Sequence, residues 1–487
     1  MSPSADASPS RPLPTGLDLL ALRALAPARY PLLLESAAAG GKARWDLLLA
    51  GGDEGLLLGA DGRTRTLAGR TLAAGFLDAL DAAQADLRTR PGCGTVTGRH
   101  REDGALGVDG ALGVNGALGV DGPPFRGGWA LYLGYELAAR IEPVLRLPAF
   151  AGPLPVAAAL RCPAAVLRDR RDGRCLLVGE AGHEALLATI EADVARLPER
   201  PRGFAPPPVP LTLDEEAPDR FLDGVARVHQ HLRAGDVFQV NLSRGWRARY
   251  AEPVDPARLY AALRAANPAP FAGLFTLPGG SVASSSPERL LSIRGRRIET
   301  RPIAGTRPRF PGDDEAARIA ELVGHPKERA EHIMLIDLER NDLGRVCEPG
   351  SVRVDELMTV ESYAHVHHIV SNVSGTLRED VTAGQAIAAV FPGGTITGCP
   401  KLRCMQIIAA LEGEGRGPYT GAMGYLDGNG DMDLNILIRT LWTDGDRVAF
   451  RAGAGIVVDS VAERELAETR AKARGLLRAL GQADGRD

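Results

Sequence analysis

The C-terminal half of the chain shows two hydrophobic periods, one typical of strands and one typical of helices. Three segments alternate or are rich in β-branched residues between Gly and Asp, which predicts strands at 236–246, 296–305 and 446–458. Three other segments predict helices, at 315–323, 326–342 and 462–480. Because strands and helices are interspersed rather than strictly alternating, we expect a large mixed α+β fold rather than a doubly wound nucleotide-binding fold.

Proline-rich and glycine-rich stretches divide the 487 residues of the chain into parts. Residues 1–16, rich in Ser, Pro and Ala, predict a disordered tail. Residues 201–220 combine dense proline with an acidic run, which predicts a linker between an N-terminal region (17–200) and a C-terminal domain (221–482). Three near-identical hexads predict a Gly-rich loop over 102–124, with a calcium-binding repeat as the alternative, because three short copies cannot stack into a solenoid.

Composition and charge exclude several classes of protein. Hydrophobic residues make up 45% and charged residues 24%, so collagen-like, disordered and coiled-coil classes fit poorly. With 57 Lys and Arg against 61 Asp and Glu, the net charge is −4 and no long basic tract occurs, so we expect no nucleic-acid partner. No run of about 18 apolar residues predicts a membrane span. Six scattered cysteines without a C-x-x-C pair, and an N-terminus without signal-peptide features, predict a cytoplasmic protein.

Two predicted helices each carry a Glu-x-x-Glu pair, Glu328 with Glu331 and Glu465 with Glu468. A spacing of three places both carboxylates of a pair on one helical face. Four carboxylates brought together from two helices repel one another unless a hard cation lies among them, which predicts Mg²⁺. The alternative is a solvated surface, because Glu468 and Lys472 also have the i,i+4 spacing of an exposed salt bridge.

Three basic residues lie where a negatively charged partner is expected. Lys401 begins an apolar helix after the Gly-rich turn in 389–408, and backbone N–H groups beside a lysine suit an anionic ligand. A tight structural turn explains the same segment equally well. Arg439 and Arg451 lie in apolar, strand-like surroundings, where a guanidinium needs a carboxylate from the protein or from a substrate.

Histidine and cysteine patterns give no second site. In a strand, His365 and His367 share one face and His368 points to the other, and we expect histidines hydrogen-bonded in a sheet rather than a transition-metal site. The chain has no G-x-S-x-G elbow, and neither Cys399 nor Cys404 has the context of a glutamine-hydrolysing nucleophile. We therefore expect that the chain does not generate its own ammonia.

Seven strings of the C-terminal part, in one fixed order, resemble the chorismate-utilising enzymes. These strings are SPERLL (286–291), ETRPIAGTRPR (299–309), HPKERAEHIMLIDLERNDLGRV (325–346), FPGGTITGCPKLRCMQII (391–408), YTGAMGY (419–425), DMDLNILIRT (431–440) and AGAGIVVDS (452–460). The N-terminal resemblance is thinner and consists mainly of PLLLES (31–36), with NPAPF (267–271) beyond the linker. The resemblance implies a large chorismate-utilising fold with antiparallel sheets and outer helices.

The resemblance also implies roles for individual residues. Mg²⁺ bridges Glu331, Glu468 and the ring carboxylate of chorismate in this family, which leaves Glu328 and Glu465 as outer or water-mediated partners. Glu288 is similar to the general acid that protonates the leaving 4-hydroxyl group. The other active-site positions are Tyr419 and Arg439 at the enolpyruvyl carboxylate, Gly455 and Lys472 at the ring carboxylate, and His368, Thr395, Lys401, Gly421, Gly453, Ala304 and Thr306 elsewhere in the site.

The branch of the family depends on the nucleophile. Isochorismate and salicylate synthases carry a lysine base that activates water where this chain has Gln239, and an amide cannot take a proton at neutral pH. Ammonia is then the better substrate, which leaves aminodeoxychorismate synthase and anthranilate synthase. QVNLS, SSSPERLL and PGGTITG look more like the former, whereas Ala304 in PIAGT replaces its covalent lysine and looks like the latter. A non-catalytic chorismate-fold binding subunit is the alternative from another class.

Two further expectations follow from the resemblance. The aminating synthases receive ammonia from a glutamine amidotransferase subunit, so we expect such a partner. PLLLES and NPAPF resemble segments that form a tryptophan pocket, which implies an indole amino acid near Glu35, Ser36 and Pro268. An apolar strand and a proline turn explain the same two strings without a ligand.

Overall fold

The computed structural model describes most of the chain. The described residues are 10–38, 44–89, 122–199, 203–308, 314–324, 326–362 and 366–482. Most of the expected 1–16 tail, the repeat hexads of the expected 102–124 loop, and His365 lie outside these residues.

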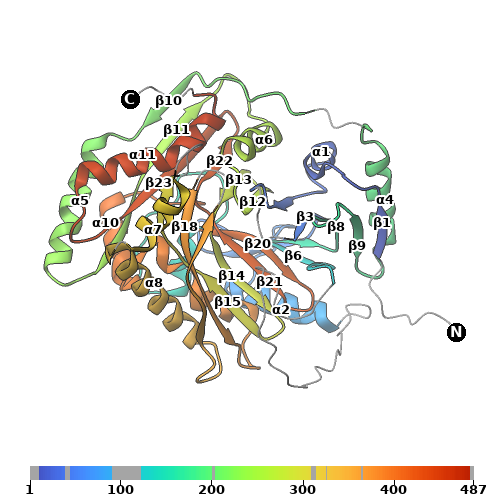
Figure 1. Ribbon diagram of the computed structural model, residues 1–487. Helices are drawn as coiled ribbons and strands as arrows, with labels where there is room; N and C mark the ends of the chain where they lie inside the picture. Colours follow the sequence, from blue (N-terminus) through green and yellow to red (C-terminus); the bar gives the residue numbers. More distant parts are fainter. Residues whose placement is uncertain are drawn as a thin grey trace.

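Two large antiparallel sheets form the centre of the protein (Figure 1). The first sheet runs in the order β1 (Ser10–Leu13), β9 (Cys175–Gly179), β8 (Ala164–Asp169), β3 (Trp45–Ala50), β2 (Leu32–Glu35), β12 (Phe271–Leu277), β13 (Gly280–Ser286), β22 (Thr440–Asp444), β23 (Arg447–Ile456), β11 (Gln239–Arg249) and β10 (Thr212–Glu215), with β19 (Gly398–Cys399) paired to β11. The second sheet runs in the order β16 (Ile303–Pro308), β18 (Val366–Thr376), β15 (Arg297–Arg301), β14 (Arg289–Arg294), β21 (Met432–Ile436), β20 (Ala422–Asp427), β6 (Gly128–Leu133), β7 (Ala157–Cys162), β4 (Gly55–Leu58) and β5 (Thr64–Thr66), with β17 (Arg353–Ser362) paired to β18.

Helices cover the outer surfaces of the sheets. They are α1 (Leu19–Leu25), α2 (Phe76–Thr89), α3 (Ala138–Ile141), α4 (Glu184–Ala195), α5 (Pro218–Arg233), α6 (Pro256–Ala266), α7 (Glu315–Gly324), α8 (Pro326–Gly344), α9 (Ala383–Val390), α10 (Lys401–Glu412) and α11 (Ala462–Ala479), with 3-10 turns η1 (Tyr135–Leu137) and η2 (Gly394–Ile396). In Figure 1, α5, α10 and α11 lie together beside β11 and β23, whereas α1 and α4 lie on the opposite side of the protein. The expected α+β fold with antiparallel sheets and outer helices is confirmed.

Both sheets contain strands from both parts of the chain. In the first sheet β2 pairs with β12, and in the second sheet β6 pairs with β20. The segment expected as a linker, 201–220, itself contributes β10, which pairs with β11. The N-terminal and C-terminal parts are therefore joined by continuous hydrogen bonding, which a sequence boundary drawn from proline content does not predict.

The pleat of β6 divides its residues between two apolar cores. Ala130 and Tyr132 pack in the cluster that covers the first sheet. Trp129, Leu131 and Leu133 pack in the cluster of the second sheet with α2, α8 and α9. Successive side chains of a strand point to opposite faces. One face of β6 therefore packs in the apolar cluster of the first sheet, and its other face packs against the outer helices.

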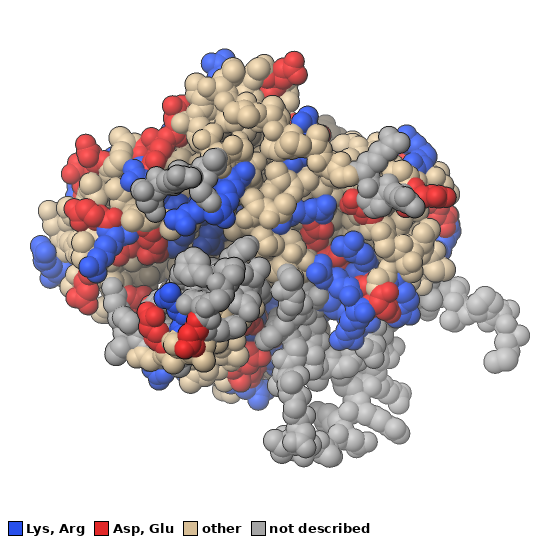
Figure 2. All heavy atoms as spheres, turned by 45° about the horizontal axis from the view of Figure 1, so that its top comes forward, with Lys and Arg blue, Asp and Glu red and all other residues tan. Residues whose placement is uncertain are grey.

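The surface is mixed in charge. Lys and Arg side chains are interspersed with Asp and Glu side chains over the face shown in Figure 2, in keeping with a net charge of −4. None of the described helices is long and apolar enough to cross a lipid bilayer.

Candidate active site

Glu288 lies buried in the short connection between β13 and β14. Its carboxylate Oε1 accepts a hydrogen bond of 2.7 Å from Thr395 Oγ1 of η2, and its backbone carbonyl accepts one of 3.0 Å from the Ile436 N–H. Burial raises the pKa of Glu288 to about 7, and the negative charge of Glu339 adds to the rise, whereas the hydrogen bond from Thr395 opposes it. A carboxyl with that pKa holds a proton near neutral pH and can give it to a leaving group.

Arg439 is buried and is acted on electrostatically by three other predicted site residues. Burial lowers the pKa of Arg439, and Tyr419, Glu288 and Glu468 oppose that change. Arg439 has φ +53° and Thr420 has φ +63°, a backbone region that is costly for residues with a side chain. Such strain, held in place by the surrounding sheet, is frequent at ligand-binding sites.

His368 completes this side of the site from β18. Burial lowers the pKa of His368 to about 4, and the nearby Arg439 lowers it further, so the imidazole is neutral at pH 7. On the same strand, His367 Nδ1 lies 2.7 Å from Ser362 Oγ, which is the sheet hydrogen bonding expected from the sequence. Ala304 and Thr306 lie on β16, in register with Ile369 and His368 of β18.

Two glycines of β23 leave room for side chains of the neighbouring strand β11. A Cβ atom on Gly453 would lie 2.7 Å from Tyr419 Oη and 2.9 Å from Asn241 Oδ1, and one on Gly455 would collide with the Gln239 amide. Lys472 Nζ of α11 donates a hydrogen bond of 3.0 Å to the Gly453 carbonyl. Gly421, just before β20, is similarly confined, because a Cβ there would meet the backbone of Leu133 and Pro418.

The four glutamates expected to bind metal do not form a ready cluster. Within the described ranges, no group of three or more His, Cys, Asp and Glu side chains is placed to hold a metal ion. Glu468 instead forms an i,i+4 salt bridge of 2.7 Å with Lys472, and both side chains are partly exposed. A pair of carboxylates such as Glu331 and Glu468 still fits Mg²⁺ as a donor set, because Mg²⁺ keeps several waters and needs only one or two protein carboxylates.

Lys401 lies in an ion pair that sequence reasoning missed. Its Nζ pairs with Asp342 and donates a hydrogen bond of 3.1 Å to the Val390 carbonyl. Glu339, one helical turn before Asp342 on α8, accepts from the Gly394 N–H at 3.4 Å. Burial raises the pKa of Glu339 to about 7, Asp342 adds to the rise, and Lys401 opposes it. The positive charge of Lys401 is therefore paired with Asp342 and also lowers the pKa of Glu339. Both acids belong to the ERND string (339–342).

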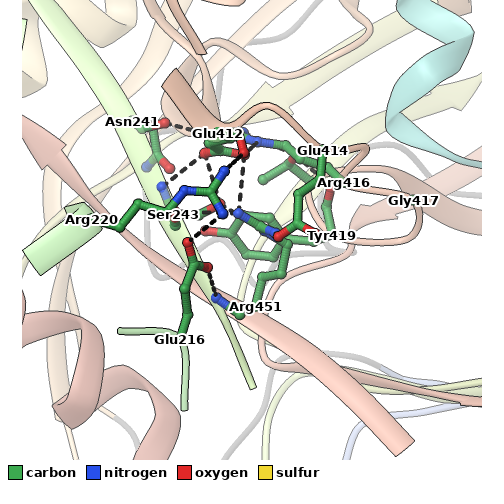
Figure 3. Close-up of polar contacts among 12 residues, drawn as sticks. Glu216, Arg220, Asn241, Ser243, Glu412, Glu414, Arg416, Gly417, Tyr419 and Arg451 are labelled. Carbon is green, nitrogen blue, oxygen red and sulfur yellow. Dashed lines mark hydrogen bonds and ion pairs between the residues drawn. The ribbon is translucent and has the colours of Figure 1, made fainter. Parts of the chain in front are cut away.

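A fully buried ionic network fixes the loop that carries Tyr419 (Figure 3). Arg416 Nη2 donates to Glu412 Oε1 at 2.6 Å and to the Asn241 carbonyl at 2.7 Å, and its guanidinium lies 5.4 Å from the centre of the Tyr419 ring. Arg451 Nη2 pairs with Glu412 Oε2 at 3.3 Å. The carboxylate expected for Arg451 is therefore supplied by the protein, and the network joins β11, α10, β23 and Tyr419.

A separate cavity shares no residue with this site. Its lining residues are Leu34, Glu35, Ser36, Trp45, Leu47, Pro124, Pro270, Phe271, Ala272, Arg289, Arg294, Met423, Gly424, Tyr425, Asp433 and Asn435. It includes Glu35 and Ser36 of the expected tryptophan pocket, whereas Pro268 is not part of its lining. Glu35 Oε1 accepts hydrogen bonds from Tyr260 Oη at 2.7 Å and from Arg264 Nη1 at 3.0 Å. The buried Ser36 hydroxyl, in contrast, has no hydrogen-bond partner among the described residues.

We expect tryptophan to bind in this cavity and the Ser36→Ala variant to bind it about fivefold more weakly. An unpaired buried hydroxyl that hydrogen-bonds a ligand contributes about 1 kcal/mol. Isothermal titration calorimetry of both proteins, freed of bound amino acid by unfolding and refolding, measures the change. No heat from the wild-type protein would refute the assignment, and titration with alanine controls for binding of the amino-acid group alone.

Comparisons with known proteins identify the family of the chain. The family model described as chorismate binding enzyme matches residues 87–478. An anthranilate synthase component I-like protein from a Synechocystis species is 43% identical over 361 residues, which cover 73% of each chain. Aminodeoxychorismate synthase component 1 from Bacillus subtilis is 49% identical over 263 residues, which cover 54% of this chain and 56% of that protein.

Solved structures show the same architecture. Anthranilate synthase component I from Streptococcus pneumoniae has a TM-score of 0.74 at 30% identity, and the match covers 89% of this chain and 92% of that one. The menaquinone-specific isochorismate synthase from Escherichia coli has a TM-score of 0.70 at 19% identity, with 98% and 94% covered, and shares the fold. The expected resemblance is confirmed, and the chain belongs to the chorismate-binding enzyme family.

Proposed function

We propose that the chain is the chorismate-aminating component of an aminodeoxychorismate synthase. It converts chorismate and ammonia to 4-amino-4-deoxychorismate, a precursor of 4-aminobenzoate and folate, in the presence of Mg²⁺. The observation that carries the proposal is the neutral Gln239 of β11, whose amide borders Gly455 of β23 and offers no base to activate water, together with the proton-holding Glu288. The 49% identical Bacillus subtilis protein with the aminodeoxychorismate synthase name supports the branch.

The residues of the site divide the reaction between them. In this proposal Arg439 and Tyr419 hold the enolpyruvyl carboxylate, and Lys472 binds the ring carboxylate. Glu288, oriented by Thr395, gives its proton to the 4-hydroxyl group, which leaves as water. Ammonia adds to the ring and releases one proton, which restores the protonated Glu288, so chorismate and ammonia become aminodeoxychorismate and water. Glu331 and Glu468 would hold Mg²⁺, which when bound neutralises the ring carboxylate of the substrate.

A separate glutamine amidotransferase subunit supplies the ammonia in this proposal. Glutamine hydrolysis of that kind needs an activated nucleophile such as a thiolate. Burial raises the pKa of each cysteine in the described part of the chain, including Cys404, whose pKa is about 12. These thiols are free of disulfides, which fits the cytoplasmic location that we propose.

Anthranilate synthase component I is the second candidate. Ala304 stands in PIAGT as it does in that branch, and relatives named anthranilate synthase, such as that of Streptomyces coelicolor at 42% identity, cover more of the chain than the Bacillus protein does. The two products differ in one group, because anthranilate forms with release of pyruvate and aminodeoxychorismate keeps the enolpyruvyl carbons.

Product analysis tests the proposal. We expect the purified chain, given chorismate, an ammonium salt and Mg²⁺, to form a product that retains the enolpyruvyl group, as measured by mass spectrometry and a coupled pyruvate assay. Glutamine without a partner subunit should give no product, since burial disfavours the thiolate of every cysteine in the described part of the chain. Stoichiometric pyruvate with a fluorescent aromatic amine would instead identify anthranilate synthase, and no chorismate consumption would favour a binding subunit.

A further inference from the structure

Thr420 has a backbone conformation that normally belongs to glycine. The Gly421 N–H donates a hydrogen bond of 2.9 Å to the Pro418 carbonyl, which closes a turn over 418–421, and Thr420, the third residue of this turn, has φ +63°. Turns of type II favour glycine or asparagine at that position, because positive φ is costly for other residues. A β-branched residue such as threonine fits it poorly, so the contacts around Thr420 have to hold the turn in this shape.

The Thr420 hydroxyl makes two of these contacts. Thr420 Oγ1 donates a hydrogen bond of 2.5 Å to the Tyr419 carbonyl and accepts one of 3.3 Å from Arg416 Nη1. Arg416 Nη1 also donates to the Ile396 carbonyl of η2 at 3.2 Å, and Arg416 Nη2 is held by Glu412 in the network of Figure 3. Because Arg416 is only 1% exposed and is fixed by these other partners, it holds the Thr420 hydroxyl in one place.

The turn is also hydrogen-bonded to the segment that leads to Arg439. The Thr420 N–H donates to the Leu437 carbonyl at 2.9 Å, and the Leu437 N–H donates to the Gly421 carbonyl at 2.8 Å. Arg439, two residues after Leu437, also has a positive φ, of +53°. The two residues proposed to hold the enolpyruvyl carboxylate, Tyr419 and Arg439, therefore belong to backbone segments that are bonded to each other at Thr420.

The orientation of the Tyr419 side chain depends on this turn. Tyr419 is the second residue of the turn, and its Oη lies 2.7 Å from the position of a Cβ on Gly453 of β23. A change of φ at Thr420 would rotate the chain before it relative to β20, and the Tyr419 ring would move with that chain. A turn that is held in place before the substrate arrives needs no reorganisation on binding, which lowers the cost of binding.

We propose that Thr420 is a positioning residue for chorismate, whose hydroxyl, held by Arg416, keeps the turn in the left-handed conformation that orients Tyr419 toward the enolpyruvyl carboxylate. The proposal rests on the proposed function for the identity of the substrate, and it holds for either aminated product. Without the hydroxyl, only a fraction of the molecules have the turn in the binding conformation, and the apparent affinity for chorismate falls by that fraction.

Three substitutions of Thr420 separate the hydroxyl, the backbone conformation and the packing. Thr420→Ser keeps the hydroxyl and its two hydrogen bonds, so its Kd for chorismate should stay within about twofold of wild type. Thr420→Ala differs from the serine variant by the hydroxyl alone and should bind chorismate roughly tenfold more weakly, the equivalent of one buried hydrogen bond. Thr420→Gly also lacks the hydroxyl but adopts positive φ without strain, so its Kd should lie between the other two. A residue that only filled space would give the opposite order, with glycine weakest because it leaves the largest cavity.

Isothermal titration calorimetry with chorismate and Mg²⁺, without ammonium, measures these Kd values in the absence of amination. In initial rates at saturating ammonium, the KM for chorismate should rise in Thr420→Ala while kcat changes less than about twofold, because the carboxylate is bound equally before and during the reaction. Thr443→Ala is the matched control. Thr443 is a buried threonine of β22, outside the candidate site, whose Oγ1 accepts a hydrogen bond of 3.0 Å from the Ser281 N–H, so this variant should keep the wild-type Kd.

The outcomes separate this proposal from the proposed function. Equal Kd values for Thr420→Ser and Thr420→Ala, or weaker binding by Thr420→Gly than by Thr420→Ala, would overturn the positioning role and leave the aminating activity in place. A wild-type protein that binds chorismate without aminating it would overturn the proposed function, and the same series of Kd values would still decide the role of Thr420. Circular dichroism checks folding. If the alanine variant does not fold, equal Kd values for the serine and glycine variants would overturn the role.

Discussion

Replacing Glu288 with Gln is expected to lower kcat for chorismate roughly 10²–10⁴-fold, the usual contribution of a positioned general acid. The amide keeps the size of the side chain and can still accept the hydrogen bond from Thr395, so the local structure should survive. The variant loses only the proton that converts the 4-hydroxyl group into water. Stopped or steady-state assays of chorismate consumption at saturating ammonium measure the loss, and an unchanged kcat would remove Glu288 from the mechanism.

The pH dependence of kcat/KM tests the role of the Glu288 carboxyl independently of the mutation. Because burial raises the pKa of Glu288 to about 7, the acid is protonated below that pH and loses its proton above it. The kcat/KM for chorismate, measured at constant free ammonia, should therefore fall as pH rises through about 7. Glu339→Gln is the matched control, since it removes a neighbouring charge that helps to raise this pKa and should move the falling limb to lower pH without abolishing turnover.

Local patterns predicted the elements of the fold, but not their pairing. The alternation in 236–246 and the helical spacing in 462–480 correspond to β11 and α11. The pairing of β2 with β12 and of β6 with β20 joins residues more than 200 positions apart, as in Leu34 with Gly273. The register of such distant strands depends on which faces of the whole sheet are buried. The hydrophobic periodicity of a single segment does not contain that information.

The candidate site likewise contains residues that the sequence predicted and residues that it did not. Glu288, Arg439, Tyr419 and Glu468 were predicted from motifs, and in the structure Tyr419, Glu288 and Glu468 each act electrostatically on the buried Arg439. Asn241 was missed, because its position beside Gly453 becomes visible only once the glycines of β23 are seen to lie opposite. The sequence signals that could have found it are the i,i+2 amides in QVNLS and the Gly-x-Gly in AGAGI, which are matched to each other only by the strand register.

Glu339 was missed for a different reason. The ERND string shows its charge and its spacing from Asp342, but a carboxylate on a helix is usually solvated, and only the fold places this one beneath Gly394 and next to Lys401. The contacts of Lys401 bear on the two explanations that the sequence left for it. Sequence left an anionic ligand and a structural turn as equal alternatives, and in the structure the ammonium group is already paired with Asp342.

Changing either Glu331 or Glu468 to Gln is expected to abolish Mg²⁺-dependent turnover, because each change removes one of the two carboxylates proposed to hold the ion. Folding should be unaffected. The Glu468–Lys472 salt bridge is partly exposed, and pairs of that kind contribute about 0–1 kcal/mol, so the melting temperature of Glu468→Gln should shift only slightly. Initial rates across a series of free Mg²⁺ concentrations, with thermal melts of each variant, measure both effects.

Glu463→Gln provides the matched control for the metal variants. Glu463 lies on the same helix α11, is exposed, and belongs to neither Glu-x-x-Glu pair, so this variant should keep the Mg²⁺ dependence of the wild-type protein. It removes the same charge from the first turn of the same helix, which excludes a general electrostatic effect of the helix N-terminus as the cause. Wild-type rates in both Glu331→Gln and Glu468→Gln would refute the magnesium assignment. In that case the Glu468–Lys472 salt bridge would explain the acidic pair of α11 without a metal.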